Sequence, residues 1–478
     1  MTTAAADSIK NTFEQAGQGQ VFQYWDELDD AGKEKLLALA EQIDLGEVQR
    51  LNEELVLGGE AHGVDLSDLH PAPYIPRPEH GGDPQRWHSA RCVGEEALRA
   101  GRVAAFTVAG GQGTRLGFNG PKGTFPVSPI RRATLFQVFA ERILANRRRY
   151  ESNIPWFLMT SHLNHEATVS FFKENDFFGL GEDTVHFFQQ GLMPAVDLEG
   201  KILLQDKDQI AMSPDGHGGS LRALVRSGST EIMKDAGIDV ISYFQVDNPL
   251  VRGIDPALIG FHIQAGSEMS SKMLPKAYPG EKVGHFCTQR DKTIVVEYSD
   301  MPDELCEETT SSGELRFIAG SIAIHTLDRA FVERMGGENP DTALPFHRAD
   351  KKVATLDANG VPFKPDTPNG VKFEMFVFDA LPFAQHPVII ATTREDEFAP
   401  VKNAEGVDSP QTCKEAQLAE FTRWAQAAGV EIASDENGQP PFEFEITPKF
   451  ADTQEAFVSR WMSLSPKPEI KAGTVLDV

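Results

Sequence analysis

The glycine-rich stretch VAGGQGTRLGFNGPKGTFPV (residues 108–127) overlaps the end of a short apolar run, RVAAFTVA (residues 102–109). The apolar run is typical of a buried parallel strand. After it, Gly110, Gly111 and Gly113 turn the backbone without Cβ atoms, so the N–H groups of the loop can approach phosphate oxygens directly. The stretch therefore predicts an anion-binding loop behind a strand, with a plain turn between strand and helix as the structural alternative.

Two cations follow the glycines and narrow the interpretation. Arg115 and Lys122 can donate hydrogen bonds to the same anion. A P-loop would need G-K-S or G-K-T after its glycines, and this stretch has neither. A dinucleotide fingerprint would need a glycine where Leu116 stands and an immediate helix, whereas Pro121 and Pro126 delay any helix. The loop therefore matches neither of these nucleotide-binding motifs.

Strand-like and helix-like segments alternate downstream of this loop. This alternation predicts βα units and a Rossmann-like α/β fold, with a mixed, mostly parallel sheet flanked by helices. Ligands in such folds bind outside the carboxyl ends of the strands. We expect strands at 102–109, 154–161, 239–247, 321–327 and 386–393, and helices at 134–149, 165–175, 255–266, 328–335 and 370–384.

The two ends of the chain differ from this central region. The pattern of residues 26–45 predicts an amphipathic helix capped by Asp29 or Asp30, and a proline-rich linker follows it. Near the other end, residues 417–429 predict one helix, with short strands and turns after it. We expect an N-terminal helical and linker region (1–98), a catalytic domain (99–398) and a small C-terminal domain with β structure (399–478).

Charge and composition restrict the partners. The 478 residues are 40% hydrophobic and carry a formal net charge of −26. A long phosphate backbone would be repelled by such a surface, so no nucleic-acid partner is expected. A small anionic ligand would need a local cationic pocket.

The cysteines and the apolar runs indicate the compartment. The four cysteines are scattered without a C-x-x-C motif, so neither a disulfide framework nor a zinc site is expected. No apolar run reaches the roughly 18 residues that span a bilayer, and the first residues lack the pattern of a secretory signal. We expect a cytoplasmic protein without a membrane partner.

Several motifs in one order resemble a known family. AGGQGTRLG…PKGTFPV resembles the signature loop of the UTP–sugar-1-phosphate uridylyltransferases, especially the eukaryotic-type UDP-N-acetylglucosamine pyrophosphorylases. The resemblance covers about residues 102–406 and implies a nucleotidyltransferase fold of the GT-A-like type. The further motifs that carry it are FFQQGLMPA, MSPDGHGGSLRAL, QVDNPL, VVEYSD, KPDTPNGVKFEMFVFD and REDEFAPVKNAEG.

The resemblance implies that UTP lies against the glycine-rich loop. In the family the backbone of this loop contacts the nucleotide, and its two cations meet the phosphates. The implied catalytic residues are Arg115, Lys122 and Lys402, and the implied UTP-binding residues are Val108, Ala109, Gly110, Gly111, Lys122, Gln190, Gly216 and Asp247.

Gln190 and Asp247 have the chemistry that these implied roles need. The Gln190 amide offers a donor and an acceptor, as the imide edge of uracil requires. Asp247 stands at the expected carboxyl end of a parallel strand, where a carboxylate can bind Mg²⁺. Because Asn248 and Pro249 follow it, Asp247 could instead cap a turn.

The resemblance also implies a sugar-phosphate site made of Glu297, Tyr298, Lys402, His217 and Ser321. An isolated Glu-Tyr pair would more often lie on the surface, and a loop lysine would more often pair with nearby acids. His217 and Ser321 replace asparagines of the N-acetylglucosamine enzymes. Gly-His-Gly resembles the UDP-glucose and broad-specificity UDP-sugar enzymes instead, so the sequence leaves the sugar open.

These residues predict a Mg²⁺-dependent uridylyltransferase whose partners are UTP and a sugar 1-phosphate. The sugar phosphate is already an anionic nucleophile, so no general base and no covalent intermediate are expected. The sugar is N-acetylglucosamine 1-phosphate or a hexose 1-phosphate. Two alternatives remain open, another nucleoside triphosphate in place of UTP and a non-catalytic nucleotide-sugar sensor that keeps the fold.

Overall fold

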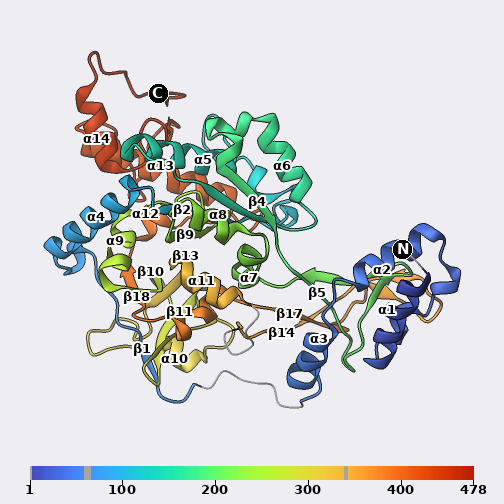
Figure 1. Cartoon of the computed structure of the whole chain (residues 1–478). Coiled ribbons are helices and arrows are strands. Elements are labelled where there is room, and N and C mark those ends of the chain that lie inside the picture. The colour runs from blue at the N-terminus through green and yellow to red at the C-terminus, as the bar shows by residue number, and fades with distance from the viewer. Residues whose placement is uncertain (1–2, 59–65, 338–342, 478) are drawn as a thin grey trace. The chain divides into compact units, whose positions relative to one another are not determined.

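The computed structural model describes residues 3–58, 66–337 and 343–477 (Figure 1). These residues form two compact units, each built from separate stretches of the chain. Unit 1 combines segments 1–65, 190–220 and 344–379, and unit 2 combines segments 66–189, 221–343 and 380–478.

Unit 2 contains the large sheet and most of the helices (Figure 1). Its helices are α4 (Pro84–Arg99), α5 (Leu135–Tyr150), α6 (His165–Glu174), α8 (Ser229–Asp235), α9 (Pro256–Ala265), α10 (Asp303–Glu307), α11 (Arg329–Gly336), α12 (Arg394–Glu397), α13 (Pro410–Ala427) and α14 (Gln454–Ser463), and most of α7 (Gly219–Arg226). Its strands are β1 (Leu69–Pro71), β2 (Val103–Val108), β3 (Trp156–Thr160), β4 (Val185–Gln189), β9 (Val240–Gln245), β10 (Met269–Pro275), β11 (Gly284–Gln289), β12 (Lys292–Val296), β13 (Ala319–Asp328), β18 (Val388–Ala391), β19 (Glu445–Ile446) and β20 (Val475–Leu476).

The described residues of unit 2 form a ten-stranded mixed sheet, which confirms the expected α/β fold. Its parallel part runs β9–β2–β3–β4. β13 lies on the other side of β9 and runs antiparallel to β9, β10 and β11, while β10 and β18 form a further parallel pair. β2 lies between β9 and β3 and is buried along almost its whole length, as its apolar run predicts, because other elements pack on the faces of the sheet.

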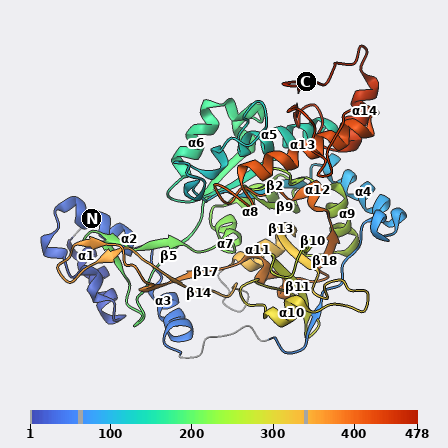
Figure 2. The ribbon, with the colours of Figure 1, turned by 180° about the vertical axis from the view of Figure 1, so that it is seen from behind.

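Helices cover the parallel part of the sheet. α4, α5, α6 and α9 contribute side chains to one hydrophobic cluster with Val103 and Ala105 of β2 and Trp156 and Leu158 of β3. In both views α13 lies beside α5 (Figures 1 and 2). A second cluster packs α13 against α14 through Phe421, Trp424, Phe457 and Trp461, which gives the C-terminal segment a core of its own.

Unit 1 is built from short elements. Its helices are α1 (Thr3–Gln15), α2 (Asp30–Ala40) and α3 (Leu45–Leu51), and its strands are β5 (Leu192–Pro194), β6 (Leu204–Asp206), β7 (Gln209–Ile210), β8 (Met212–Pro214), β14 (His347–Lys351), β15 (Thr355–Leu356), β16 (Pro362–Phe363) and β17 (Gly370–Glu374). As expected, Asp29 caps α2, because its side chain accepts a hydrogen bond from Gly32 N.

One expected helix is wrong. Residues 370–384 form strand β17 and a 3₁₀ turn at Val377–Phe383 instead. The burial pattern explains the difference, because Val371, Phe373 and Met375 are buried while Lys372 and Glu374 between them are half-buried. This alternation has the period of a strand, and β17 pairs antiparallel with β14.

The compact units follow different boundaries from the three expected domains. Segments 190–220 and 344–379, from inside the expected catalytic domain, belong to unit 1, where Val196 and Val371 form a bridge. Residues 399–478 belong to unit 2 rather than to a unit of their own, and they contain α14, a helix that sequence reasoning missed.

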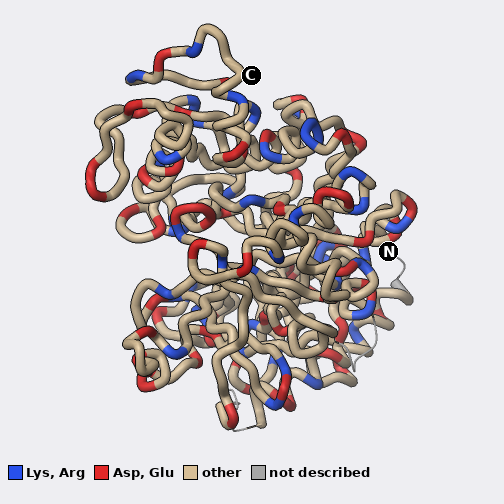
Figure 3. The backbone as a smooth tube through the Cα atoms, turned by 90° about the vertical axis from the view of Figure 1, so that its left-hand side faces the viewer, with Lys and Arg blue, Asp and Glu red and all other residues tan. Residues whose placement is uncertain are grey.

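Charge is spread along the chain rather than separated by sign. Figure 3 shows Asp and Glu interspersed with Lys and Arg along the backbone, so the net charge of −26 comes from a general excess of acids. Within the described ranges, no helix combines the length and the apolar character needed to cross a bilayer.

We expect Gly260→Ala to destabilise unit 2. A Cβ atom on Gly260 of α9 would lie 1.6 Å from Ala90 O of α4, so the two helices would have to move apart. This should lower the free energy of unfolding by about 1–3 kcal/mol, more than the roughly 1 kcal/mol that alanine gains in a helix. The thermal unfolding midpoint measures it, with Gly280→Ala as a control because no described atom lies within 4 Å of that Cβ position. Equal midpoints for the two variants would contradict the close helix contact.

Candidate active site

The glycine-rich loop leaves the carboxyl end of β2 and folds back on itself. Lys122 N donates a hydrogen bond to Gly111 O at 3.0 Å. Asn164 Nδ2 donates to Ala109 O at 2.9 Å and to Gly111 O at 3.3 Å. No described atom lies within 4 Å of the position that a Cβ atom of Gly111 would take. The loop is thus held on one side, and the backbone at Gly111 is open to a ligand.

Asn164 is a residue that sequence reasoning missed. It is fully buried between β3 and α6, and its Oδ1 accepts a hydrogen bond from Ser161 N at 2.8 Å. An asparagine directly before a helix usually caps that helix, but this side chain makes no capping hydrogen bond to α6. Only the fold brings it to a loop 53 residues away in the sequence.

Lys122 is a buried residue of the same loop. A Cβ atom on the following residue, Gly123, would lie 2.1 Å from the Phe136 ring, so glycine lets the turn press against the aromatic core. The Nζ atom of Lys122 lies 3.6 Å from Oδ2 of Asp247. The structure therefore brings together the expected phosphate-binding lysine and the expected metal ligand.

Asp247 lies just beyond β9 and has oxygen atoms suitable for a hard cation. Within the described ranges, no three His, Cys, Asp or Glu side chains are arranged to hold a metal ion by themselves. Mg²⁺ is usually bound by one or two carboxylates together with substrate phosphates and water. The donor set at Asp247 fits a cation that enters with a phosphate-bearing substrate.

Lys402 lies in a tight loop closed by Asp408. Lys402 N donates to Asp408 O at 2.7 Å, and Lys402 Nζ lies 3.7 Å from Asp408 Oδ2. Burial raises the pKa of Asp408; the charge of Asp247 also raises it, while Lys402 lowers it. The two carboxylates and Lys402 thus influence one another electrostatically. Asp408 was not among the site residues predicted from the sequence, because no local pattern distinguishes it from the many other acidic residues.

The other expected residues of unit 2 lie on several elements. Val108 ends β2, with Ala109 and Gly110 directly after it. Arg115 is exposed, in a 3₁₀ turn of the loop, and forms no ion pair with any residue that the structure describes. Its guanidinium is therefore available to an anion.

The expected sugar-binding residues of unit 2 belong to the antiparallel strands. Glu297 directly follows β12 and is half-buried, and Tyr298 after it is exposed. Ser321 lies within β13, paired with Met273 of β10 and Gly284 of β11.

Gln190 and Gly216 meet in unit 1. Gln190 Nε2 donates a hydrogen bond to Gly216 O at 2.6 Å. Gly216 has φ +84°, and a Cβ atom there would lie 2.3 Å from Met375 O, so the position requires glycine. The hydrogen bond fixes the orientation of the Gln190 amide and uses one of its two N–H groups.

His217 follows Gly216 and packs against aromatic rings. Its ring centroid lies 5.4 Å from that of Phe376 and 5.8 Å from that of Phe378. Its Nδ1 accepts a hydrogen bond from Val377 N at 3.2 Å, so the neutral ring carries its hydrogen on Nε2. Burial, with the charge of His347 adding to it, lowers the pKa of His217 to about 4. His217 can therefore donate a hydrogen bond to a ligand, but it brings no positive charge near neutral pH.

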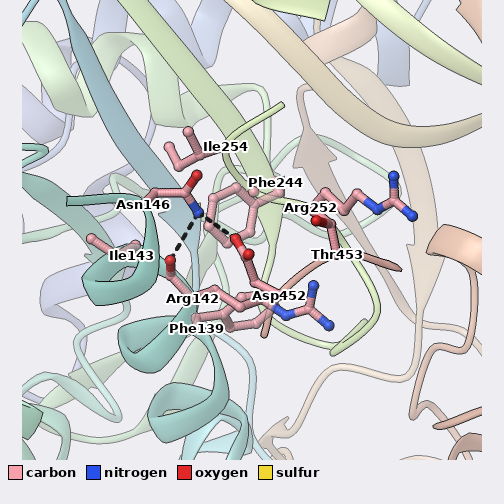
Figure 4. Close-up of a pocket in the computed structure, with 10 residues that line it drawn as sticks. Phe139, Arg142, Ile143, Asn146, Phe244, Arg252, Ile254, Asp452 and Thr453 are labelled. Atoms are coloured by element: carbon pink, nitrogen blue, oxygen red, sulfur yellow. Dashed lines mark hydrogen bonds between the residues drawn. The ribbon is translucent and has the colours of Figure 1, made fainter. Parts of the chain in front are cut away.

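A separate small cavity in unit 2 contains none of the expected site residues (Figure 4). Its volume of about 20 Å³ is enough for roughly one water molecule. Asn146 Nδ2 donates to Asp452 Oδ2 and to Arg142 O at its edge, both at 2.9 Å, which ties α5 to the C-terminal segment. This cavity belongs to the internal packing of unit 2.

Comparisons with known proteins agree on one family. The family model described as UTP–glucose-1-phosphate uridylyltransferase matches residues 85–420. The chain is 38% identical over 455 residues to UDP-N-acetylhexosamine pyrophosphorylase-like protein 1 of Xenopus tropicalis, covering 91% of this chain and 88% of the relative. It is 34% identical over 440 residues to UDP-N-acetylglucosamine pyrophosphorylase of Saccharomyces cerevisiae, covering 88% and 91%. Among solved structures, the uridine diphosphate N-acetylglucosamine pyrophosphorylase of Trypanosoma brucei in complex with an inhibitor matches with a TM-score of 0.82 and 25% identity, covering 100% of this chain and 99% of that one.

We expect His217 to stay neutral in the folded protein at pH 5.5. Its pKa of about 4 lies below the ordinary value of 6.5, so the unfolded chain binds more protons between these two values. The stability that neutral His217 contributes is complete above about pH 6.5 and is lost as the pH falls towards 4. ¹⁵N NMR of the imidazole should show Nδ1 unprotonated at pH 5.5, with the chain unfolded in urea as the control. Protonation of folded His217 near pH 6.5 would contradict the half-buried, Val377-bound geometry.

Proposed function

The chain belongs to the UTP–glucose-1-phosphate uridylyltransferase family, and from that premise we propose how its residues serve the reaction. It is a UDP-sugar pyrophosphorylase, which makes a UDP-sugar and pyrophosphate from UTP and a sugar 1-phosphate. The observation that carries our assignment is the contact between Lys122 and Asp247 at the carboxyl ends of β2 and β9.

The reaction depends on the relative positions of the two substrates and on compensation of their negative charge, and it requires no proton transfer to an enzyme residue. A phosphate oxygen of the sugar 1-phosphate forms a bond to the α-phosphorus of UTP, and the bond from that phosphorus to the bridging oxygen breaks, so pyrophosphate leaves. The nucleophile is already an anion and requires no base. The enzyme must bring two polyanions together in line and offset their repulsion.

We assign the cations to the phosphates. Lys122 neutralises charge on the UTP phosphates and on the departing pyrophosphate, and Arg115 adds donors from the glycine-rich loop. Lys402 binds the phosphate of the sugar 1-phosphate, which would displace Asp408 as its ionic partner. The backbone from Val108 to Gly111 lies against the nucleotide, which the open position at Gly111 supports.

We assign the uracil to Gln190. Its amide is already oriented by Gly216, so little side-chain freedom would be lost when uracil binds. Its carbonyl oxygen can accept from the imide N–H of uracil, and its second N–H can donate to a uracil carbonyl.

The family generally depends on a divalent cation, and we propose Mg²⁺ with Asp247 as its protein ligand. When bound, the cation would neutralise charge on the substrate phosphates. Asp247 would hold it at the end of β9, and Lys122 would then pair with phosphate oxygens.

We propose an N-acetylhexosamine 1-phosphate as the preferred sugar substrate. The names of the relatives support it, since they are UDP-N-acetylhexosamine and UDP-N-acetylglucosamine pyrophosphorylases. Glu297 and Tyr298 would contact the sugar hydroxyls. His217 and Ser321 would occupy the two positions at which the N-acetylglucosamine enzymes have asparagine. His217 would donate a hydrogen bond to the sugar through Nε2.

No observation favours the alternative of a non-catalytic sensor, since the relatives carry the names of enzymes. The described residues also keep Lys122, Asp247 and Lys402, which a sensor could lose. We further propose a cytoplasmic location, which the four scattered cysteines support.

We expect Lys122→Met to lower turnover by roughly 10²–10³-fold, because it removes a cation that acts on charge developing in the transition state. Pyrophosphate release from UTP and a sugar 1-phosphate measures the effect. Lys471→Met removes an exposed lysine that pairs with exposed Glu469, and it should leave turnover unchanged. Near-normal turnover of a folded Lys122→Met variant would refute the assigned role.

We expect the sugar panel to favour the N-acetylated substrate. With UTP and Mg²⁺, kcat/KM for N-acetylglucosamine 1-phosphate should exceed that for glucose 1-phosphate by roughly tenfold or more, since a site built for a polar group discriminates against its absence. The variants His217→Asn and Ser321→Asn show whether these positions tune the ratio. A preference for glucose 1-phosphate would contradict the proposed sugar substrate. It would indicate that His217 and Ser321 change the specificity of the site towards hexoses without an N-acetyl group.

A further inference from the structure

A buried carboxylate holds together three elements behind the candidate active site. Glu397 of α12 is only 2% exposed. Its two carboxylate oxygens accept hydrogen bonds from Lys272 Nζ at 2.7 and 2.6 Å, from Thr392 Oγ1 at 2.7 Å and from Arg252 N at 3.1 Å. Buried polar atoms are normally satisfied by hydrogen bonds, and here the donors come from three separate segments of the chain, which Glu397 therefore ties together.

Lys272 connects this carboxylate to the start of α9. Its side chain is 2% exposed, and its Nζ also lies 2.5 Å from Asp255 Oδ2. Asp255 caps α9 by accepting a hydrogen bond from Ala257 N. Burial is the largest single influence on the pKa of Asp255 and acts to raise it. The charge and hydrogen bond of Lys272, together with the charge of Arg252 and the N–H of Ala257, hold this pKa below its usual value. The charges of this cluster are therefore compensated inside the protein.

Asn248 joins the end of α12 and the residues just after it to the end of β9. This side chain is 5% exposed; its Nδ2 donates to Glu397 O at 2.7 Å, and its Oδ1 accepts from Ala399 N at 3.0 Å. In addition, Val401 N donates to Asp247 O at 2.8 Å. We call these three hydrogen bonds the Asn248 bridge.

The Asn248 bridge has a proposed functional residue at each end. Asp247 is the neighbour of Asn248, and Lys402 is the neighbour of Val401. Asp247 follows a central strand of the sheet, whereas Lys402 belongs to an irregular segment that contains only the single turn of α12 before α13. Without the Asn248 bridge, we therefore expect Lys402 to move relative to Asp247.

We infer that Asn248 and Glu397 are positioning residues that hold Lys402 at a fixed place relative to Asp247. This rests on the proposed roles of Asp247 and Lys402. In-line attack requires the sugar phosphate and the α-phosphate of UTP to be held at a set separation, and a displacement of about 1 Å can cost roughly 10²-fold in rate. The buried acid and the amide hold the lysine in place from behind, without touching substrate.

The test is a double-mutant cycle between Asn248 and Lys402. Asn248→Ala should lower kcat/KM for the sugar 1-phosphate by roughly 10–100-fold, with the larger change in the KM for that substrate and little change in the KM for UTP. In a Lys402→Ala background the same substitution should cost less than about threefold, because the residue that it positions is gone. Asn248→Asp, which keeps the acceptor and loses the donor to Glu397 O, serves if the alanine variant does not fold.

Asn146→Ala is the matched control. Asn146 is also a buried amide of unit 2 with two donated hydrogen bonds, but they tie α5 to Asp452 (Figure 4). Its loss should lower the thermal midpoint without raising the KM for the sugar 1-phosphate, and any effect on rate should add to that of Lys402→Ala.

Two outcomes would overturn the inference in different ways. If Lys402→Ala is impaired but Asn248→Ala costs the same factor in both backgrounds, the positioning role is wrong while the proposed role of Lys402 stands. If Lys402→Ala leaves the KM for the sugar 1-phosphate and the turnover unchanged, the proposed role of Lys402 fails, and the positioning role fails with it.

Discussion

The register of β2 against β9 is the constraint on which the candidate active site depends. Val108 lies opposite Gln245 in this parallel pair, so the two strands end at the same level. The glycine-rich loop therefore begins beside the segment that carries Asp247, and Lys122 can reach that carboxylate after the loop folds back. A parallel pair needs a long crossover connection, which here includes α5 and β3, so residues distant in sequence become neighbours at one edge.

Two kinds of ion pair lie near the candidate active site, and they differ in distance and burial. Near the carboxyl ends of β2 and β9, Lys122 Nζ lies 3.6 Å from Asp247 Oδ2, and in the loop before α13 Lys402 Nζ lies 3.7 Å from Asp408 Oδ2. Deeper in the protein, Lys272 makes shorter contacts with Glu397 and is almost fully buried. Breaking a buried pair of this kind is costly. Under the proposed roles of Lys122 and Lys402, the two looser pairs exchange their carboxylates for substrate phosphates while the Lys272–Glu397 cluster stays intact.

The sequence predicted the elements whose pattern is local. The apolar run of β2, the glycine-rich loop and the cap of α2 by Asp29 follow from neighbouring residues, and the structure agrees with each. Residues 370–384 were misjudged because the alternation of apolar and polar residues covers only Val371 to Met375, and a mostly apolar stretch follows it. The period of two in the first part indicates a strand, which the pairing of β17 with β14 confirms. Asn164 and Asn248 could not be found in this way. Their roles depend on partners 53 and 149 residues away, and an asparagine in a turn has no local feature that reveals them.

The composition of unit 1 has a consequence for how the chain is made. Gln18 and Asn52, near the amino end, both donate hydrogen bonds to Gly200 O, and the third segment of the unit ends at Asp379. At roughly 5–20 residues per second, the ribosome needs about 15–60 seconds to add the residues between the first segment and the last. During that time the N-terminal helices have no complete partner surface. Unit 1 is therefore expected to close late in synthesis, and its first segment lacks its full set of partners until then.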